Sequence, residues 1–378
     1  MIRKDDVKWW VLEAKKHPES VATIIEELAG RLSELDAENE RLRDEIVQLQ
    51  RHPTAAVGGA EVSALQDKVA TLQALLAGNA SSKPSAVFIS DRLQPARLPL
   101  PQARQLAREG DPVLNQPAML RLRCMLLARP HDELLLFTSQ GRSFKLSPTD
   151  VPALAGGKDW PAVEVPNLAN GERLTAAVAV TQPPRFWTIV TRRGYVRQFL
   201  HVELDMKLTQ GKQLIESLSR NDAPVAAVNG DRGDLLVITR WGKGVRFPQR
   251  AIASSGSTAL ALEPDDEVVA ALSLPSDTTI LIVTASGYAA RRDMAHFAAR
   301  SSPGGAGKPL IQAFDVLGTF PFDPDAQLLY LTYSGKLVLV PAADVPLHQR
   351  SSKGARVHVF DRDPAVAVTL IPAQVRRT

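Results

Sequence analysis

Two sets of basic residues in this sequence could bind a polyanion. The strand set follows a recurring turn and consists of Arg97, Lys145, Arg246 and Arg291. Alternation along a strand puts these four on one face, which a solvated surface explains equally well. The loop set consists of Lys158, Lys212, Lys308, Arg350 and Lys353, with Arg300 and the tail residues Arg376 and Arg377.

The charge of the chain is unevenly distributed. Residues 1–80 hold 10 Lys and Arg against 14 Asp and Glu, whereas residues 81–378 hold 35 against 27. The surplus in the second part suggests a polyanionic partner, and ordinary solubility is the alternative.

Motifs for catalysis and cofactor binding are weak. The segment ending in Gly307 and Lys308 resembles a phosphate-binding loop, but Ser302 replaces its first glycine and Pro309 its final Ser or Thr. The seven histidines are scattered, without metal-ligand spacing. Carboxylates such as Asp265 and Asp266 precede a strand, where a turn role is expected. We therefore expect no enzyme activity, no cofactor and no metal.

The single cysteine and the N-terminus indicate a compartment. Cys124 has no partner for a disulfide, so we expect a buried, inert thiol and a reducing environment. The first residues lack the apolar stretch of a signal peptide, and no run of 18 apolar residues occurs. The expected location is the cytoplasm, in association with the nucleoid.

An apolar run ending in Thr-x-x-Gly occurs five times, beginning at Thr138, Thr191, Thr239, Thr284 and Thr332. The glycines are 53, 48, 45 and 48 residues apart, so each interval is one structural unit. Each turn joins two β-rich runs, and two further β-rich runs follow. Four short strands per unit predict propeller-like blades.

A sixth, degenerate unit precedes these five. Val87 to Leu98 aligns with Leu135 to Leu146, with Ser90 in place of threonine and Leu93 in place of glycine. Because leucine disfavours positive φ, we expect a different turn there. The sequence thus predicts a mainly β, six-bladed pinwheel over 86–373, with blades at 86–131, 132–182, 183–229, 230–275, 276–323 and 324–373.

The N-terminal region has the heptad pattern of a coiled coil over 21–51, after a helical segment at 1–20. Asn39 occupies an a position, which favours a parallel homodimer; a single amphipathic helix or an antiparallel hairpin is the alternative. The seam predicted to mediate dimerisation consists of Ile25, Leu28, Leu32, Leu35, Asn39, Leu42, Ile46 and Leu49.

The rest of the N-terminal region and the C-terminus complete the predicted organisation. Proline and paired glycines break the helix at 52–60, a second short helix follows at 61–77, and a polar linker occupies 78–85. Residues 374–378 form a basic tail.

The repeat resembles the C-terminal β-pinwheel domain of the A subunits of DNA gyrase and topoisomerase IV. The resemblance covers about three-quarters of the chain. It rests on the Thr-x-x-Gly hairpins, on the Asp-Val-Pro segments at Asp150 and Asp344, and on the loops at Gly211-Lys212, Gly307-Lys308 and Lys353-Gly354. The basic box that pins DNA in the first gyrase blade is missing, so the chain looks closer to topoisomerase IV.

The resemblance implies a disc whose basic rim binds and bends duplex DNA without reading its sequence. The sequence departs from the family in that no winged-helix or cleavage domain precedes the predicted disc, so we expect no DNA-breaking tyrosine. The residues expected to contact DNA are Lys158, Arg197, Lys212, Arg246, Arg300, Lys308, Arg350 and Lys353.

Two functions compete. The first is a non-catalytic, dimeric DNA-binding protein that acts as an accessory or regulator of a type II topoisomerase. The second is a protein-interaction scaffold that recruits a topoisomerase or another nucleoid partner through the coil or the disc.

Overall fold

The computed structural model describes most of the chain after residue 83. Besides the helical residues Gly30, Ser33, Ala37 and Arg41, the described ranges are 84–154, 158–162, 168–210, 213–215, 218–219, 221–231, 233–274, 278–360 and 362–373. The chain divides into two compact units, Met1–Ala74 and Leu75–Thr378. Apart from those four residues, the predicted coiled coil with its seam, the helix break, the second helix and the basic tail lie outside the described residues.

The described part of the second unit forms six antiparallel sheets, which we call blades 1 to 6. In each blade a hairpin supplies the middle and outer strands, and the next long strand of the chain pairs with the middle strand. The strands, in the order middle, outer, inner, are β1 (Ser85–Ser90), β2 (Pro95–Pro99) and β3 (Leu122–Ala128) in blade 1; β4 (Glu133–Thr138), β5 (Ser143–Leu146) and β6 (Leu174–Val180) in blade 2; β7 (Phe186–Thr191), β8 (Tyr195–Leu200) and β9 (Pro224–Asn229) in blade 3; β10 (Asp234–Thr239), β11 (Lys243–Pro248) and β13 (Val268–Leu274) in blade 4; β14 (Thr279–Thr284), β15 (Tyr288–Asp293) and β17 (Val316–Pro321) in blade 5; and β18 (Gln327–Thr332), β19 (Leu337–Pro341) and β21 (Ala365–Ile371) in blade 6.

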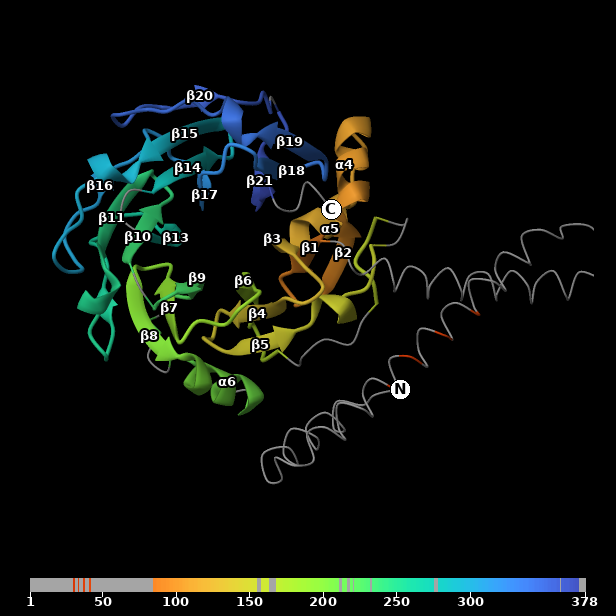
Figure 1. Ribbon diagram of the computed structural model, residues 1–378, viewed down its shortest axis with the longest axis horizontal. Helices are drawn as coiled ribbons and strands as arrows, with labels where there is room; N and C mark the ends of the chain where they lie inside the picture. The colour runs from red at the N-terminus through yellow and green to blue at the C-terminus, as the bar shows by residue number, and fades with distance from the viewer. Residues whose placement is uncertain are drawn as a thin grey trace, which may run out of the picture. The chain divides into compact units, whose positions relative to one another are not determined.

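The six blades follow one another around a ring, with the inner strands facing its centre (Figure 1). Each inner strand lies against the inner strand of the next blade, and β21 of blade 6 lies against β3 of blade 1. The ring of blades is therefore closed. The prediction of a mainly β, propeller-like fold is confirmed.

The hydrophobic core lies between the blades, because the middle strands are buried on both faces. In β10, Leu236 and Ile238 pack against Ile280 and Ile282 of blade 5, whereas the alternate residues pack toward blade 3. The same packing joins the two ends of the ring, where Phe88 of blade 1 shares a cluster with residues of blade 6. Burying an apolar side chain of this size stabilises the fold by about 1.5–3 kcal/mol.

The outer strands of three blades pair with a short strand that belongs to the following repeat. The strand β12 (Ser257–Thr258) pairs with β8, β16 (Lys308–Pro309) with β11, and β20 (Ala355–Arg356) with β15. We call these three the exchange strands. Isolated bridges join Gln213 to Arg142 and Pro112 to Lys336 in the corresponding places. The prediction of four strands per repeat therefore needs correcting, because the fourth strand belongs to the neighbouring sheet.

Helices precede the isolated bridge at both of these positions. The segment between β2 and β3 forms α4 (Leu100–Glu109) and α5 (Gln116–Arg121), and α4 packs against β19 of blade 6. The segment after β8 forms α6 (His201–Gln210), which packs against β5 of blade 2. Short 3-10 turns follow the outer strands at Pro148–Asp150, Gln249–Ala251, Met294–His296 and Ala342–Asp344. No helix within the described residues is long and apolar enough to span a membrane.

The turn in blade 1 corrects another prediction. Leu93 has φ +62, and its N–H donates to the carbonyl of Ser90 at 3.1 Å, as Gly141 does to Thr138 at 2.9 Å. The turn is therefore of the same kind as in the other blades. The Leu93 side chain is 1% exposed and packs with Val87 and Ile89, so apolar burial offsets the backbone strain.

Candidate nucleic-acid interface

The Thr-x-x-Gly turn is built from buried polar groups. The hydroxyl of Thr239, 1% exposed, accepts a hydrogen bond from the backbone N–H of Lys243 at 3.3 Å. The carboxylate of Asp266 accepts one from the N–H of Trp241 at 3.1 Å. The turn role expected for Asp266 is thus confirmed, and the turn is held rigidly at the end of the blade.

The turn glycine holds the exchange segment of the following blade. Gly242 has φ +72, and its carbonyl accepts from the N–H of Leu310 at 2.8 Å. A Cβ atom on Gly242 would lie 2.2 Å from the carbonyl oxygen of Ile311, so only glycine fits. The same bond runs from Leu214 to Gly141, from Ala259 to Gly194, from Val357 to Gly287 and from Val113 to Gly335.

Exposed basic side chains gather where two exchange strands run along neighbouring blades. Lys308 lies on β16, Arg356 lies on β20, and Arg350 and Lys353 lie on the segment that leads into β20; all four are exposed. Figure 1 shows β16 and β20 on the outer side of the ring, next to β11 and β15. We call the surface formed by these four residues the β16–β20 edge.

Backbone contacts join the two segments of the β16–β20 edge. The carbonyl of Ser352 accepts from the N–H of Gln312 at 2.8 Å, and the Gln312 side chain donates to the carbonyl of Ser351 at 3.4 Å. Lys308 and Lys353 are thus carried by segments that hold each other in place.

Within the described residues, the four cations of the β16–β20 edge are not neutralised by ion pairs. Within the described part of the chain, none of its four side chains forms an ion pair with a carboxylate. The sequence has no Asp or Glu over residues 294–314 or 345–360. These four cations are therefore available to an external anion.

The ring of Tyr288 holds two of the four cations side by side. The Lys353 Nζ lies 4.4 Å from the ring centroid, and the Arg356 guanidinium carbon lies 5.6 Å from it. Cation–π contacts of this kind contribute about 0.5–1 kcal/mol at exposed sites. Tyr288 therefore orders two long side chains that would otherwise be free to rotate.

A buried arginine supports the loop that carries Arg350 and Lys353. Arg292 is 6% exposed, and its Nη1 donates to the carbonyl of His348 at 2.9 Å. Burial lowers the pKa of the Arg292 guanidinium from its usual value. The His348 ring is 3.2 Å from the Ser352 hydroxyl, which accepts from the N–H of Gly354 at 3.2 Å.

The strand set of basic residues has a different role. The Nε of Arg97 donates to the carbonyl of Val151 at 2.7 Å, and Lys145 pairs with Asp205 and, at 3.0 Å, with Glu133. Burial alone would lower the pKa of Lys145, but its bonds to the two carboxylates outweigh this and raise it. Arg291 stacks on Phe322 at 4.4 Å. These cations brace contacts within and between the blades.

The structure argues against the predicted DNA contact by Arg246. It is 7% exposed, its Nε donates to Asp234 at 2.7 Å, and its Nη1 donates to the carbonyl of Met294 at 2.7 Å. A guanidinium that is buried and already bonded to a carboxylate is not accessible to a phosphate.

The other predicted contact residues lie in several places. Lys308, Arg350 and Lys353 meet at the β16–β20 edge. Arg300 is next to them, but its Nη2 donates to the carbonyl of Ala306 at 2.8 Å and so braces the loop before β16.

The remaining predicted contact residues lie elsewhere. Arg197 is on β8 of blade 3 with its guanidinium 4.9 Å from the Phe199 ring, and Lys158 is on the loop between β5 and β6 of blade 2. Lys212 lies outside the described residues.

Sequence reasoning missed Arg356. The sequence feature that could have identified Arg356 is its position two residues after Lys353-Gly354. Arg356 lies on β20, which forms a strand only because it pairs with β15 of the neighbouring blade. Among the described residues no group of His, Cys, Asp and Glu side chains could hold a metal ion.

The comparisons with known proteins agree on the type of blade. A model of the family "DNA gyrase C-terminal domain, beta-propeller" matches residues 132–158, 233–275 and 278–321. The A subunit of DNA gyrase from Escherichia coli (strain K12) is 25% identical over 242 residues, which cover 61% of this chain and 28% of that protein. Its counterpart from Haloquadratum walsbyi is 28% identical over 271 residues, 65% of this chain and 31% of that protein. The chain thus spans less than a third of the length of these relatives.

Two solved structures show the same fold. The C-terminal domain of DNA gyrase A superposes with a TM-score of 0.61 at 18% identity, covering 76% of this chain and 100% of the domain. The C-terminal domain of DNA topoisomerase IV gives a TM-score of 0.54 at 18% identity, covering 78% and 94%. The β-propeller part of this chain is therefore similar in sequence and in fold to the C-terminal domain of DNA gyrase A.

Proposed function

We propose that this chain is a non-catalytic protein that binds duplex DNA through the β16–β20 edge. The observation that carries the proposal is the set of four exposed cations on two neighbouring exchange strands, with no acidic partner among the described residues. These four cations lie on blades that are similar to those of the C-terminal domain of DNA gyrase A. This similarity supports double-stranded DNA as the partner over other polyanions.

The chemistry of the edge favours contact with the DNA backbone. Lysine and arginine side chains on a convex surface neutralise phosphates, whereas base recognition needs an element that enters a groove. We therefore expect little sequence preference.

The length of the edge limits the extent of the contact. The exchange strands β16 and β20 cover the outer strands of blades 4 and 5, whereas helices α4 and α6 cover blades 6 and 2. A contact confined to neighbouring blades bends a duplex locally rather than wrapping it around the ring.

The proposal extends to an accessory role beside a type II topoisomerase. The similarity to gyrase A supports this partner, and the predicted parallel coiled coil would give one dimer two DNA-binding edges. A homodimer of this kind acts in the cytoplasm, where it is associated with the nucleoid. Two linked sites raise the overall affinity for one DNA molecule without adding contacts.

Salt dependence tests the proposal directly. Four phosphate contacts predict that the logarithm of the binding constant falls with the logarithm of salt concentration with a slope of about −3.6. Fluorescence anisotropy with a labelled duplex, repeated on a second duplex of unrelated sequence, should give this slope for both. Absence of binding at micromolar protein in low salt contradicts the proposal.

A protein-interaction scaffold is the second candidate, and one observation favours it. On α6, Val202 is 69% exposed and Met206 is 57% exposed, one helical turn apart. If this face mediates the function, a pull-down should retain a protein partner after nuclease treatment and lose it when both residues are changed to Gln.

A further inference from the structure

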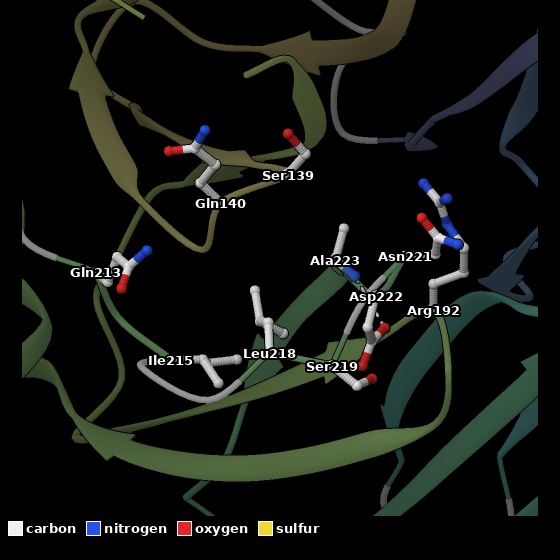
Figure 2. Close-up of a pocket in the computed structure, with 10 residues that line it drawn as sticks. All are labelled: Ser139, Gln140, Arg192, Gln213, Ile215, Leu218, Ser219, Asn221, Asp222 and Ala223. Carbon is white, nitrogen blue, oxygen red and sulfur yellow. Dashed lines mark hydrogen bonds between the residues drawn. The ribbon is translucent and has the colours of Figure 1, made fainter. Parts of the chain in front are cut away.

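We propose that the cavity between blades 2 and 3 binds a nucleotide. The cavity has a volume of about 500 Å³, within the range of small-ligand sites. Figure 2 shows its wall, formed by the turn of blade 2 at Gln140, by Arg192 of blade 3 and by residues 213, 215, 218–219 and 221–223. This site is distinct from the β16–β20 edge, so the proposal does not depend on DNA binding there.

The cavity exists because this repeat differs from another repeat of the same chain. Gln140 occupies the third position of its Thr-x-x-Gly turn, and Trp241 has that position in blade 4. The Trp241 ring lies 5.7 Å from Phe314 of blade 5 in a T-shaped contact. Phe314 lies two residues before the inner strand of its blade, as Asp222 does in blade 3. Two aromatic rings thus stand where blades 2 and 3 carry Gln140 and Asp222 at the cavity.

The cavity combines an apolar wall with polar side chains. Ile215 and Leu218 are the apolar residues of the wall. In Figure 2 their side chains lie between those of Gln213 and Asn221. A planar ring fits against such a wall, because the hydrophobic effect favours burying its faces.

Three amide side chains in the wall offer hydrogen bonds to the edge of a nucleobase. Gln140, Gln213 and Asn221 each offer both a donor and an acceptor, which is what the mixed edge of a nucleobase requires. Asn221 has φ +65, a conformation that asparagine tolerates better than most residues.

The guanidinium of Arg192 supplies the anion-binding group. Its Nε lies 3.6 Å from a Glu267 carboxylate oxygen, and its side chain remains 39% exposed at the edge of the cavity. The carboxylate in the wall, Asp222, already accepts from the backbone N–H groups of Arg193, at 2.9 Å, and Ala223, at 2.8 Å. A phosphate beside Arg192 therefore meets a partly exposed cation, and the carboxylate in the cavity wall, Asp222, is hydrogen-bonded to the backbone.

Two sources supply this chemistry: a free nucleoside phosphate and the terminal nucleotide of a DNA strand. The probes are 2′-deoxyadenosine 5′-monophosphate, deoxyadenosine, inorganic phosphate, and a short single strand with and without a 5′-phosphate. Binding is measured by calorimetry with the full chain. We expect the monophosphate to bind more tightly than deoxyadenosine or phosphate alone.

Two variants and one control locate the site. Gln140→Trp fills the cavity with the residue found in blade 4 and should abolish binding. Arg192→Ala should weaken the monophosphate at least about tenfold and leave deoxyadenosine unchanged, because it removes only the charge contact. The control is Arg193→Ala, which changes the exposed neighbour outside the cavity wall and should have no effect. Thermal unfolding of each variant separates loss of the site from loss of the fold.

The outcomes decide the proposal. Binding of the free nucleotide or of the phosphorylated strand, abolished by Gln140→Trp in a folded protein, supports it and identifies the source. Equal affinity for phosphate and the monophosphate, binding that survives Gln140→Trp, or no binding at millimolar nucleotide overturns it. DNA binding at the β16–β20 edge should be unchanged in all three variants, so the two proposals fail separately.

Discussion

The backbone N–H of Val113 in blade 1 donates a hydrogen bond of 2.8 Å to the carbonyl of Gly335 in blade 6. This bond has the same form as the four that join blades 2 to 3, 3 to 4, 4 to 5 and 5 to 6, so the first repeat closes the ring with the same contact that repeats 3 to 6 make to their predecessors. Closure matters for the proposed function because it fixes the curvature of the outer edge.

Substituting Gly335 tests the closure. Gly335 has φ +86, and an added Cβ would lie 2.3 Å from the carbonyl oxygen of Leu114. Gly335→Ala should lower the free energy of unfolding by about 2–4 kcal/mol, from backbone strain and the displaced contact. Urea denaturation measures this. The matched control is Gly110→Ala, at φ +75 with open space around it, which should cost about 1 kcal/mol. Equal losses would mean that the contact with Leu114 contributes nothing.

Glu172 tests the buried polar network of blade 2. It is fully buried, and it accepts from the Thr138 hydroxyl at 2.5 Å, from Arg142 at 2.8 Å and from the N–H of Ala169 at 2.9 Å. Glu172→Ala removes the acceptor of three hydrogen bonds from a buried site, so we expect a loss of about 3 kcal/mol in the free energy of unfolding. Chemical denaturation checks this, and a loss below about 1 kcal/mol would show that water replaces the carboxylate.

Much of the fold could be predicted from local pattern. Apolar runs, Thr-x-x-Gly turns and a constant period predict hairpins and blades, because each depends on residues close in sequence. The exchange between blades could not be predicted, because Lys308 pairs with Gly244 only after two repeats have folded. The prediction for the turn at Leu93 failed for the same reason: its burial between blades 1 and 2 outweighs the backbone preference of leucine.

The candidate site was predicted in part. The period placed Lys308 and Lys353 on loops, where exposure follows from local sequence. Sequence pattern and charge also grouped Arg246 with these lysines. Only the tertiary structure shows that the Arg246 guanidinium is hydrogen-bonded to Asp234 and to the carbonyl of Met294. The helix α6 was missed because its sequence has no period that distinguishes it from a loop.

Asp363 predicts a change of stability in acid. Burial would raise its pKa, but hydrogen bonds from Ser334 and Thr332, together with Lys336, outweigh burial and lower the pKa below the ordinary value of 3.8. A carboxylate with a lowered pKa in the folded state stabilises it above that value and loses this contribution as the pH falls through the folded pKa. Asp363→Asn should therefore destabilise the protein at about pH 6 and destabilise it less at about pH 3. Urea denaturation at both values measures this, and an equal effect at both contradicts it.

Cys124 should be unreactive in the folded protein. Burial raises the pKa of its thiol to about 12, outweighing the opposite effects of Arg123 and of a hydrogen bond with Ala177. The thiolate is the reactive form, so labelling with a disulfide reagent near pH 8 should be slow in the native state and fast in urea. Rapid native labelling would show that the thiol is accessible.

Replacing Tyr288 should weaken DNA binding although it leaves the net charge of the β16–β20 edge unchanged. Tyr288→Ala removes the ring that orders Lys353 and Arg356, so we expect DNA affinity to fall about two- to fivefold, in line with the size of a cation–π contact. Tyr288→Phe keeps the ring and should bind normally. Anisotropy titrations with both variants distinguish an ordering role from a hydrogen bond made by the hydroxyl.

The central claim is that the β16–β20 edge is the DNA-binding surface, and charge reversal measures this most directly. One variant carries Lys308→Glu, Arg350→Glu, Lys353→Glu and Arg356→Glu. Its control carries the same change at four exposed arginines outside the edge, Arg92, Arg108, Arg123 and Arg193. Both have the same net charge. In anisotropy titrations with a duplex, we predict that the edge variant loses at least about a hundredfold in affinity and most of its salt dependence, while the control changes less than about tenfold. Equal losses in the two variants would contradict the account, because binding would then depend on net charge alone.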